Sequence, residues 1–236
     1  FIVYEKEKIS YLDFCDQVSR VSSFLQKEVG IKKGDKVAIA MRNYPEYLAI
    51  LMAVASIGGI VVFVNAWWTT EEMEYGFDDS TARVCFADKE RLATIKPFAK
   101  KKSINLYSVR CIDDPEIEKY DDIVNNFERV DLIDVDLKPD DDFAIMYTSG
   151  STGHPKGVVL THRGAISATF SWLMAERVGG LLADPEKLAR RRASSVLILS
   201  PLFHVNGSHP NFFYSIARGS KIVLMYNCLL YTSDAA

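Results

Sequence analysis

Short runs of consecutive apolar residues alternate with helical segments in the first half of the chain, and this alternation restricts the fold more than any other feature. The runs occupy residues 37–41, 60–64, 84–87 and 106–109. A strand that is apolar at every position is buried on both faces, as in a sheet covered by helices on two sides. Helical patterns lie between the runs, at residues 45–57, from residue 69 onward, and at 89–101. The sequence therefore predicts an α/β fold of layered, mainly parallel sheets with helices on both faces.

Further elements are predicted on either side of these runs. Ser10 to Asp13 form a capping-box pattern, and the following apolar residues recur at every third or fourth position, which predicts an amphipathic helix ending at Gly30. Thr161 is predicted to cap another helix that runs to about Arg177. Further strands are predicted at residues 143–147, 158–160, 196–199 and 221–225, with a polar excursion at 178–194.

Negative charge is concentrated in residues 113–142, which carry 13 Asp and Glu against 3 Lys and Arg. Because this segment also contains spaced apolar residues, a solvated helix and loop is favoured over a tail that binds a partner. The basic clusters at residues 100–102 and 190–192 are short and have no interleaved aromatic residues, so nucleic-acid binding has no support. A chain of 236 residues with 11% aromatic content is expected to be globular, with one large or two small domains.

The cysteine spacing indicates the cellular compartment, and a long uncharged run raises the question of a membrane span. Cys15, Cys85, Cys111 and Cys228 lie far apart without metal-ligand spacing, which predicts reduced thiols, no metal site and a cytoplasmic protein. Residues 48–64 form an uncharged run of 17 residues, at the lower edge of a membrane span, but Gly58 and Gly59 interrupt it. We therefore predict a buried helix that leads into a buried strand, and no transmembrane segment.

The stretch from Tyr147 to Gly157 places four Ser and Thr hydroxyl groups and three glycines around one lysine, between two predicted strands. Glycines allow the backbone to approach a ligand closely, so that successive N–H groups can point at one anion, and Lys156 adds a positive charge. A flexible turn is the plain alternative, but such a turn has no need of Lys156 held behind Pro155. The stretch does not fit a P-loop, which requires glycine directly before the lysine and a helix after it. It predicts a phosphate site of another kind.

The string from Thr148 to Lys156, continued to His162, closely resembles the phosphate-binding signature of the AMP-forming adenylating enzymes, which include acyl-CoA synthetases, luciferases and peptide-synthetase adenylation domains. Pro201 to Gly207 is similar to the later P-x-F-H-x-x-G segment of that family, which lies beside the acyl pocket. Residues 34–38 are also family-like, and residues 65–69 most resemble fatty-acyl and aryl CoA ligases. The resemblance covers about residues 2–226.

The resemblance implies a two-step reaction. A carboxylate attacks the α-phosphate of ATP to give an acyl-adenylate and pyrophosphate, with Mg²⁺ assisting, and the thiol of coenzyme A then displaces AMP. ATP, Mg²⁺ and coenzyme A are the implied cofactors, and a small fatty or aryl acid is the implied substrate. Lys156 and His204 are the implied catalytic residues, with His204 at the wall between the adenylate and the acyl site. The residues implied to hold the β- and γ-phosphates are Thr148, Ser149, Gly150, Ser151, Thr152, Gly153 and Lys156.

Several elements of the family are absent from the sequence, including the adenine, ribose and Mg²⁺ segments and the C-terminal domain with the adenylation lysine. We interpret residues 1–226 as a partial N-terminal AMP-binding domain, an incomplete form of the acyl-adenylate-forming fold that is inactive alone. Residues 227–236 do not follow the family and are interpreted as a cloning or assembly artefact. Two alternatives remain, a non-catalytic nucleotide-binding fragment and another adenylating enzyme such as a peptide-synthetase adenylation domain.

Some residues outside the motifs also carry expectations. His154 and His162 are expected to face solvent, and His209 receives no role. Trp67 and Trp68 either line a groove or, more commonly for aromatic residues at a strand end, belong to the core. The final strands and helices are expected to leave apolar faces without partners, at Val196, Leu197, Ile198, Leu199, Phe212, Phe213, Ile222, Val223 and Leu224.

Overall fold

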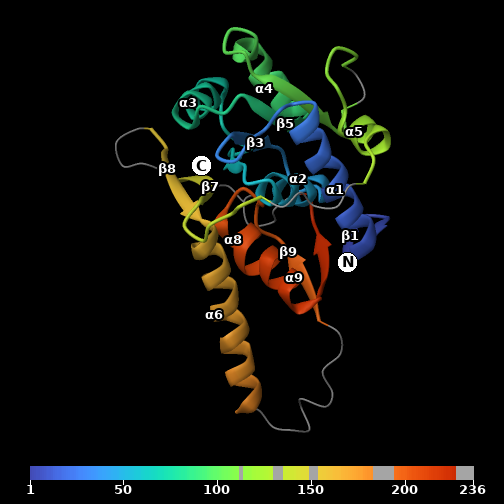
Figure 1. Ribbon diagram of the computed structural model, residues 1–236, viewed down its shortest axis with the longest axis vertical. Helices are drawn as coiled ribbons and strands as arrows, with labels where there is room; N and C mark the ends of the chain where they lie inside the picture. The colour runs from blue at the N-terminus through green and yellow to red at the C-terminus, as the bar shows by residue number, and fades with distance from the viewer. Residues whose placement is uncertain (112–113, 130–134, 149–153, 183–193, 227–236) are drawn as a thin grey trace, which may run out of the picture.

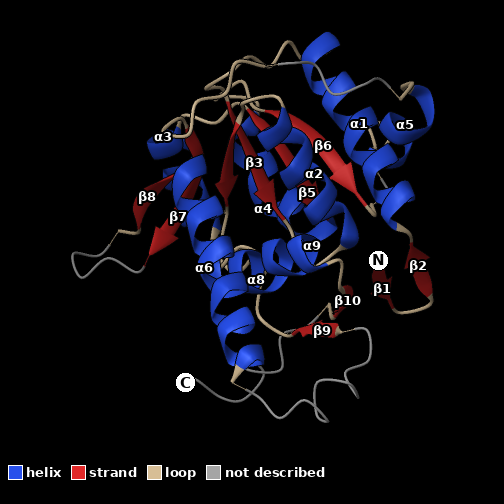
Figure 2. Cartoon of the chain, turned by 60° about the horizontal axis from the view of Figure 1, so that its bottom comes forward, coloured by secondary structure: helices blue, strands red, loops and turns tan. Residues whose placement is uncertain are grey.

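Two sheets organise the chain in a computed structural model that describes residues 1–111, 114–129, 135–148, 154–182 and 194–226 (Figures 1 and 2). The strands are β1 (Ile2–Tyr4), β2 (Glu7–Ile9), β3 (Lys36–Ala40), β4 (Ile60–Phe63), β5 (Val84–Asp88), β6 (Asn105–Val109), β7 (Asp142–Thr148), β8 (Lys156–Thr161), β9 (Ser195–Ile198) and β10 (Lys221–Leu224). The helices are α1 (Tyr11–Lys27), α2 (Pro45–Ser56), α3 (Thr70–Ser80), α4 (Lys89–Ala99), α5 (Tyr120–Asn126), α6 (His162–Leu181), α8 (Val205–Gly207), the π-helix η1 (Ser208–Phe213) and α9 (Tyr214–Arg218).

The larger sheet has six strands in the order β6-β5-β3-β4-β7-β8, and the smaller has four in the order β2-β1-β10-β9. In the larger sheet every pair of neighbours is parallel except β7 and β8. In the smaller sheet β10 is parallel to both β1 and β9, while β2 is antiparallel to β1. The predicted layered, mainly parallel α/β fold is confirmed.

Alternate residues of β3 enter two different hydrophobic cores, because successive side chains of a strand point to opposite faces of the sheet. Val37 and Ile39 pack into the core that holds the buried side chains of α1 and α2. Ala38 and Ala40 pack into the core formed with α3 and α4. The smaller sheet contributes its buried residues to the first core, so α1 and α2 lie between the two sheets. Helices thus cover both faces of the larger sheet, as predicted (Figure 2).

Local sequence signals account for where several helices begin. Ser10 and Asp13 form a complete capping box at the start of α1, and Pro45 lies in the first turn of α2. Gly58, with a φ of 76°, lets the chain reverse after α2 and enter β4 directly. The uncharged run 48–64 is therefore a buried helix and a buried strand, as predicted. Within the described ranges, no helix combines the length and the apolar character that crossing a bilayer requires.

Some elements differ from those predicted. β1, β2 and the helical stretch from α8 to α9 were not predicted, because three-residue strands and one-turn helices give too little periodicity to recognise. α6 extends to Leu181, beyond the predicted end near Arg177. In the acidic segment, the described part contains α5 with Tyr120 and Ile123 buried, in agreement with a solvated helix and loop. Residues 183–193 and the tail 227–236 lie outside the described residues.

The expectation of unpartnered faces on the last strands and helices is wrong for four of its nine residues. Ile198, Phe212, Ile222 and Leu224 are at most 3% exposed and belong to the first core. Their partners come from the start of the chain, because β1 pairs with β10 and the Phe14 ring of α1 packs edge-on against Phe212. Of the other five, Leu197 is half exposed, and Val196, Leu199, Phe213 and Val223 are partly buried.

Candidate functional site

Two of the predicted phosphate ligands, Thr148 and Lys156, lie where the strands of the β7–β8 hairpin end and begin. In the antiparallel register, Thr148 at the end of β7 pairs with Lys156 at the start of β8. Both residues are exposed, and Lys156 forms no ion pair with any other residue that the structure describes. Thr148 and Lys156 are therefore brought together at the mouth of the loop. Their five predicted partners, Ser149, Gly150, Ser151, Thr152 and Gly153, lie outside the described residues.

Helix α3 holds both sides of this loop. The Tyr147 hydroxyl donates to Asp79 Oδ2 at 2.8 Å and lies 3.1 Å from the carbonyl oxygen of Gly76. Burial, followed by the hydrogen bond to the Asp79 carboxylate, raises the pKa of Tyr147, so the phenol keeps its proton. On the other side of the loop, the His154 ring stacks on Tyr75, with ring centroids 4.8 Å apart. The ends of the loop are thus positioned from one helix.

The start of α3 is set by its own sequence. Thr69 and Glu72 form a capping box, in which Glu72 Oε2 accepts from the Thr69 N–H at 2.8 Å and Thr69 Oγ1 accepts from the Glu72 N–H at 3.3 Å. The close packing of Trp68 against Gly76 ties the helix to the preceding segment, because a Cβ on Gly76 would lie 2.6 Å from the Trp68 ring. The capped helix therefore gives the hairpin a fixed support.

His204 lies in a row of aromatic side chains beside the carboxyl end of β4. Its ring centroid is 4.9 Å from that of Phe203, and the Phe203 ring meets Trp67 edge-on at 5.0 Å. The Arg42 guanidinium lies over the Trp67 ring at 5.0 Å, within the range of a cation–π contact. Partial burial lowers the pKa of His204, so its imidazole is neutral near pH 7.

A tight turn fixes the P-x-F-H-x-x-G segment. The His204 N–H donates to the Pro201 carbonyl at 3.1 Å, and the Gly207 N–H donates to the His204 carbonyl at 3.0 Å. Gly207 packs directly on the Pro201 carbonyl, because a Cβ at this position would lie 2.1 Å from that oxygen. Any side chain at residue 207 would therefore displace the backbone that carries His204.

Trp67 and Trp68 connect the hairpin with the His204 segment. The Trp68 ring contacts Tyr147 at 5.1 Å, while Trp67 contacts Phe203. Trp68 packs against the second core, and Trp67 is 37% exposed, so one belongs to the core and the other to the surface. Arg42, Trp67 and Thr148 all follow or end parallel strands of the larger sheet, whose carboxyl edge is where α/β proteins commonly bind ligands.

Two groups of residues at this edge were missed by the sequence analysis. Asp88 and Arg91 form a buried ion pair at 3.0 Å, with both side chains at most 5% exposed. Asp88 also accepts from the Arg42 N–H at 3.0 Å, and Arg91 donates to the carbonyl oxygen of Ala66 at 2.9 Å, which joins the ends of β3, β4 and β5. Asn43 bonds to the segment before His204. Asp88 directly follows a predicted strand and precedes a predicted helix, and that position was the only available signal.

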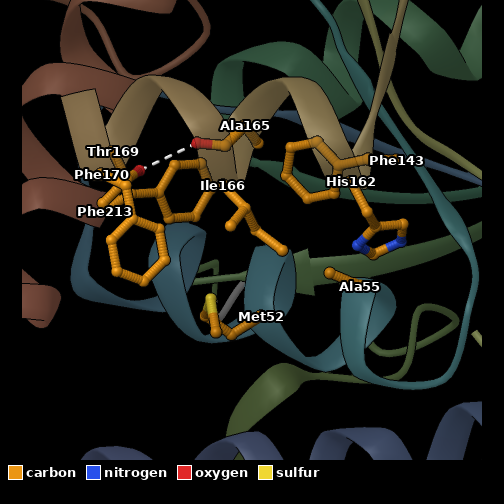
Figure 3. Close-up of a pocket in the computed structure, with 9 residues that line it drawn as sticks. All are labelled: Met52, Ala55, Phe143, His162, Ala165, Ile166, Thr169, Phe170 and Phe213. Atoms are coloured by element: carbon orange, nitrogen blue, oxygen red, sulfur yellow. Dashed lines mark hydrogen bonds between the residues drawn. The ribbon is translucent and has the colours of Figure 1, made fainter. Parts of the chain in front are cut away.

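The expectation that His162 faces solvent is wrong, whereas His154 is exposed. His162 is partly buried beside the Phe143 ring, its Nε2 has no hydrogen-bond partner among the described residues, and burial lowers its pKa. A cavity of about 250 Å³ adjoins His162 (Figure 3). It is lined by Met52, Ala55, Phe143, His162, Ala165, Ile166, Thr169, Phe170 and Phe213. Phe143 is near the amino end of β7, at the opposite end from Thr148, so this cavity is separate from the candidate site.

The sequence predicts no metal site formed by the protein itself, although the resemblance implies that Mg²⁺ assists the reaction. Within the described ranges, no group of three or more His, Cys, Asp or Glu side chains could hold a metal ion. Cys15, Cys85 and Cys111 are free thiols.

Two curated relatives cover most of the chain. The chain is 30% identical over 210 residues to 4-coumarate–CoA ligase 3 of Oryza sativa subsp. japonica, which covers 89% of this chain and 36% of that protein. It is 26% identical over 254 residues to the long-chain-fatty-acid–CoA ligase of Bacillus subtilis (strain 168). That match covers 95% of this chain and 43% of the ligase. The chain thus spans well under half the length of these relatives.

Solved structures share the fold. The anthranilate CoA ligase AuaEII in complex with anthranoyl-AMP matches 96% of this chain and 42% of its own, with a TM-score of 0.82 and 19% identity. ATP-bound MatB from Rhodopseudomonas palustris matches the same shares, with a TM-score of 0.80 and 21% identity. The model of the family described as AMP-binding enzyme matches residues 1–233. With nearly its whole length matched, the chain belongs to the AMP-binding enzyme family.

Proposed function

We propose that this chain carries the phosphate loop and the acyl-site wall of an acid–thiol ligase, which activates a carboxylate as acyl-AMP and transfers it to coenzyme A. The observation that carries the proposal is the pairing of Thr148 with Lys156 at the mouth of a loop, beside the aromatic row that ends in His204. The named activities of the relatives, on 4-coumarate and on long-chain fatty acids, support an aryl or fatty acid as the substrate.

The first step would use the loop to bind the leaving group. A carboxylate oxygen forms a bond to the α-phosphorus of ATP while the bond from that phosphorus to the bridging oxygen of the β-phosphate breaks, and pyrophosphate leaves with the electron pair. Negative charge grows on the leaving group, so donors already aimed at it stabilise the transition state more than the ground state. Lys156 supplies a full positive charge, and the hydroxyl of Thr148 supplies a donor across the hairpin. ATP binding by a family relative supports this assignment.

The second step would depend on the wall between the two substrates. The neutral imidazole of His204, with Phe203 and Trp67 behind it, presents an apolar surface suited to an aryl or alkyl group. The coenzyme A thiolate attacks the acyl carbon, the bond to the AMP oxygen breaks, and AMP leaves as the phosphate monoester. By resemblance Mg²⁺ assists the first step, and no step here is assigned to the metal.

The test is the Lys156→Ala variant of the full-length protein, assayed for pyrophosphate release with ATP and a panel of aryl and fatty acids. Removing one charge-assisted contact should lower kcat/KM for ATP by about tenfold or more. Lys101→Ala, at an exposed lysine beyond the far edge of the sheet, is the matched control and should match the wild type. Unchanged pyrophosphate release by Lys156→Ala would overturn the phosphate role.

The same assay separates the proposal from its alternatives. Binding of ATP without pyrophosphate release for any acid would indicate a non-catalytic nucleotide-binding protein. Release of pyrophosphate with acyl transfer only to a carrier protein would indicate another class of adenylating enzyme.

A further inference from the structure

Asn43 follows β3 and makes two hydrogen bonds to the segment that precedes His204, although about 160 residues separate them in sequence. Its Oδ1 accepts from the Leu202 N–H at 2.8 Å, and its Nδ2 donates to the Ser200 carbonyl at 3.0 Å. The side chain is buried, at 3% exposed, and Leu202 is fully buried. The larger sheet therefore holds the 200–202 backbone directly through one side chain.

The chemistry of these two bonds requires a carboxamide. A backbone N–H can only donate and a carbonyl can only accept, so the clamping side chain must present an acceptor and a donor side by side. Asp, Leu or Ser at position 43 would lose one or both of these groups. Each buried backbone group left without a partner would then destabilise this arrangement of the segment.

The two hydrogen bonds of Asn43, here called the clamp, hold the backbone immediately before Phe203 and His204. Phe203 follows the bonded N–H of Leu202, and His204 closes the turn by donating its own N–H to the Pro201 carbonyl. Gly207 packs against that same carbonyl, so the turn cannot shift within itself. A displacement of the 200–202 backbone would consequently move the Phe203 and His204 rings relative to Trp67, which lies in the turn after β4 of the larger sheet.

We propose that Asn43 is a positioning residue of the acyl site, whose side-chain amide sets the placement of His204 and Phe203 against Trp67. This inference rests on the proposed function of the site. Asn43 bonds to the backbone just before Phe203 and His204, whereas the residues on either side of the phosphate motif, Tyr147 and His154, contact α3. Its loss should therefore affect the carboxylate far more than ATP.

The experiment compares Asn43→Ala and Asn43→Asp in the full-length protein, using an aryl or fatty acid that the wild type adenylates. For both variants at pH 8, kcat/KM for the carboxylate should fall by about tenfold, while KM for ATP should stay within about twofold of the wild type. Asn105→Asp makes the same chemical change at an exposed residue of β6 and should leave all parameters unchanged.

The pH profile adds a readout that a general loss of stability would not produce. In Asn43→Asp the ionised carboxylate would face the Ser200 carbonyl, and burial should raise the pKa of this carboxyl. Once protonated, its O–H can donate to the same carbonyl and restore the second bond. The defect of Asn43→Asp relative to wild type should therefore shrink between pH 8 and pH 6, whereas that of Asn43→Ala should stay constant.

Several outcomes would overturn the inference. A proportional loss of the carboxylate and ATP parameters together with a lowered melting temperature would make Asn43 a core residue, as would failure of both variants to fold. Wild-type kinetics in Asn43→Ala would show that the clamp has no effect on the site. An inactive wild-type enzyme would refute the proposed function itself, which distinguishes that failure from failure of the clamp.

Discussion

Helices α2 and α6 are both rich in apolar residues, yet they differ completely in burial. Of the 12 residues of α2, 10 are buried between the two sheets. None of the 20 residues of α6 is buried. Along α6, Ile166, Phe170, Met174 and Val178 recur at intervals of four and are each 47–66% exposed. Figure 1 shows α6 projecting past the smaller sheet.

Whether an apolar helix is buried therefore depends on the elements that surround it and not on its own composition. The buried hydrophobic residues of α2 belong to the first core, together with residues of α1 and of both sheets. α6 touches the first core only near its start, where Ala165 packs against it and His162 lies beside Phe143. Farther along, Glu176 pairs with Arg218 at 2.6 Å and accepts from the Tyr214 hydroxyl at 2.8 Å. Its apolar stripe requires a covering that the described residues do not provide.

The largest expected effect comes from truncating a leucine in each helix. Leu51→Ala removes a fully buried side chain of α2 and should lower the free energy of unfolding by about 2–5 kcal/mol, because it leaves a cavity. Leu181→Ala makes the same change in α6, where the side chain is 86% exposed, and should change stability by less than about 0.5 kcal/mol. Urea denaturation of the 236-residue chain measures both.

If the two substitutions lowered the free energy of unfolding equally, α6 would be as well packed as α2, and the contrast between the helices would be wrong. The pair is matched in residue type and in secondary structure. Leu51 lies inside α2 and is fully buried, whereas Leu181 is the last residue of α6 and is 86% exposed, so a difference in burial should dominate the contrast.

Burial also affects the protonation of histidine side chains, as a buried and an exposed histidine illustrate. His209 is 4% exposed, and burial lowers its pKa from 6.5 to about 4. Between these values the unfolded chain binds a proton that the folded chain does not, so the stabilising contribution present above pH 6.5 is lost as the pH falls toward 4. At about 1.4 kcal/mol per pKa unit, this amounts to roughly 3 kcal/mol.

His209→Gln should therefore flatten the dependence of the melting temperature on pH between 6.5 and 4. His154→Gln, at an exposed residue, should leave that dependence as in the wild type. A wild-type pH profile that survives in His209→Gln would assign the acid sensitivity to other groups, with His162 as the next candidate because burial lowers its pKa too.

Much of the fold was accessible from sequence because long apolar runs and capping residues are local signals. The strands of the larger sheet and the start of α1 follow from such signals, and the structure confirms them. The smaller sheet was not predictable as a unit, since β1 and β10 pair across more than 200 residues and β1 has only three residues. The same missing pairing explains why Ile222 and Leu224 were expected to lack partners.

The candidate site also has one part that could be predicted from the sequence and one part that could not. The motif containing Lys156 is contiguous, so a loop between two strands could be predicted, whereas the antiparallel pairing of those strands was not. The hydrogen bonds that hold the site in place could not be predicted, because Tyr147 meets Asp79, and Asn43 meets Leu202, only after the chain has folded. Burial of His162 was equally invisible, since it depends on Phe143 and on the neighbouring cavity.

The smallest expected effect on stability, and the sharpest test of the exposed stripe, comes from Phe170→Glu combined with Met174→Glu. Both side chains are about two-thirds exposed, at 65% and 66%, so the double variant should change the free energy of unfolding by less than about 0.5 kcal/mol per site. It should nevertheless reduce self-association of the 236-residue chain in sedimentation velocity, because it divides a continuous apolar stripe with two charges. Asn125→Glu with Asn126→Glu adds the same charge at exposed residues of α5 and should not reduce association. If the control reduces association equally, net charge and not the stripe governs it; if the double variant unfolds the chain, α6 is packed as tightly as α2.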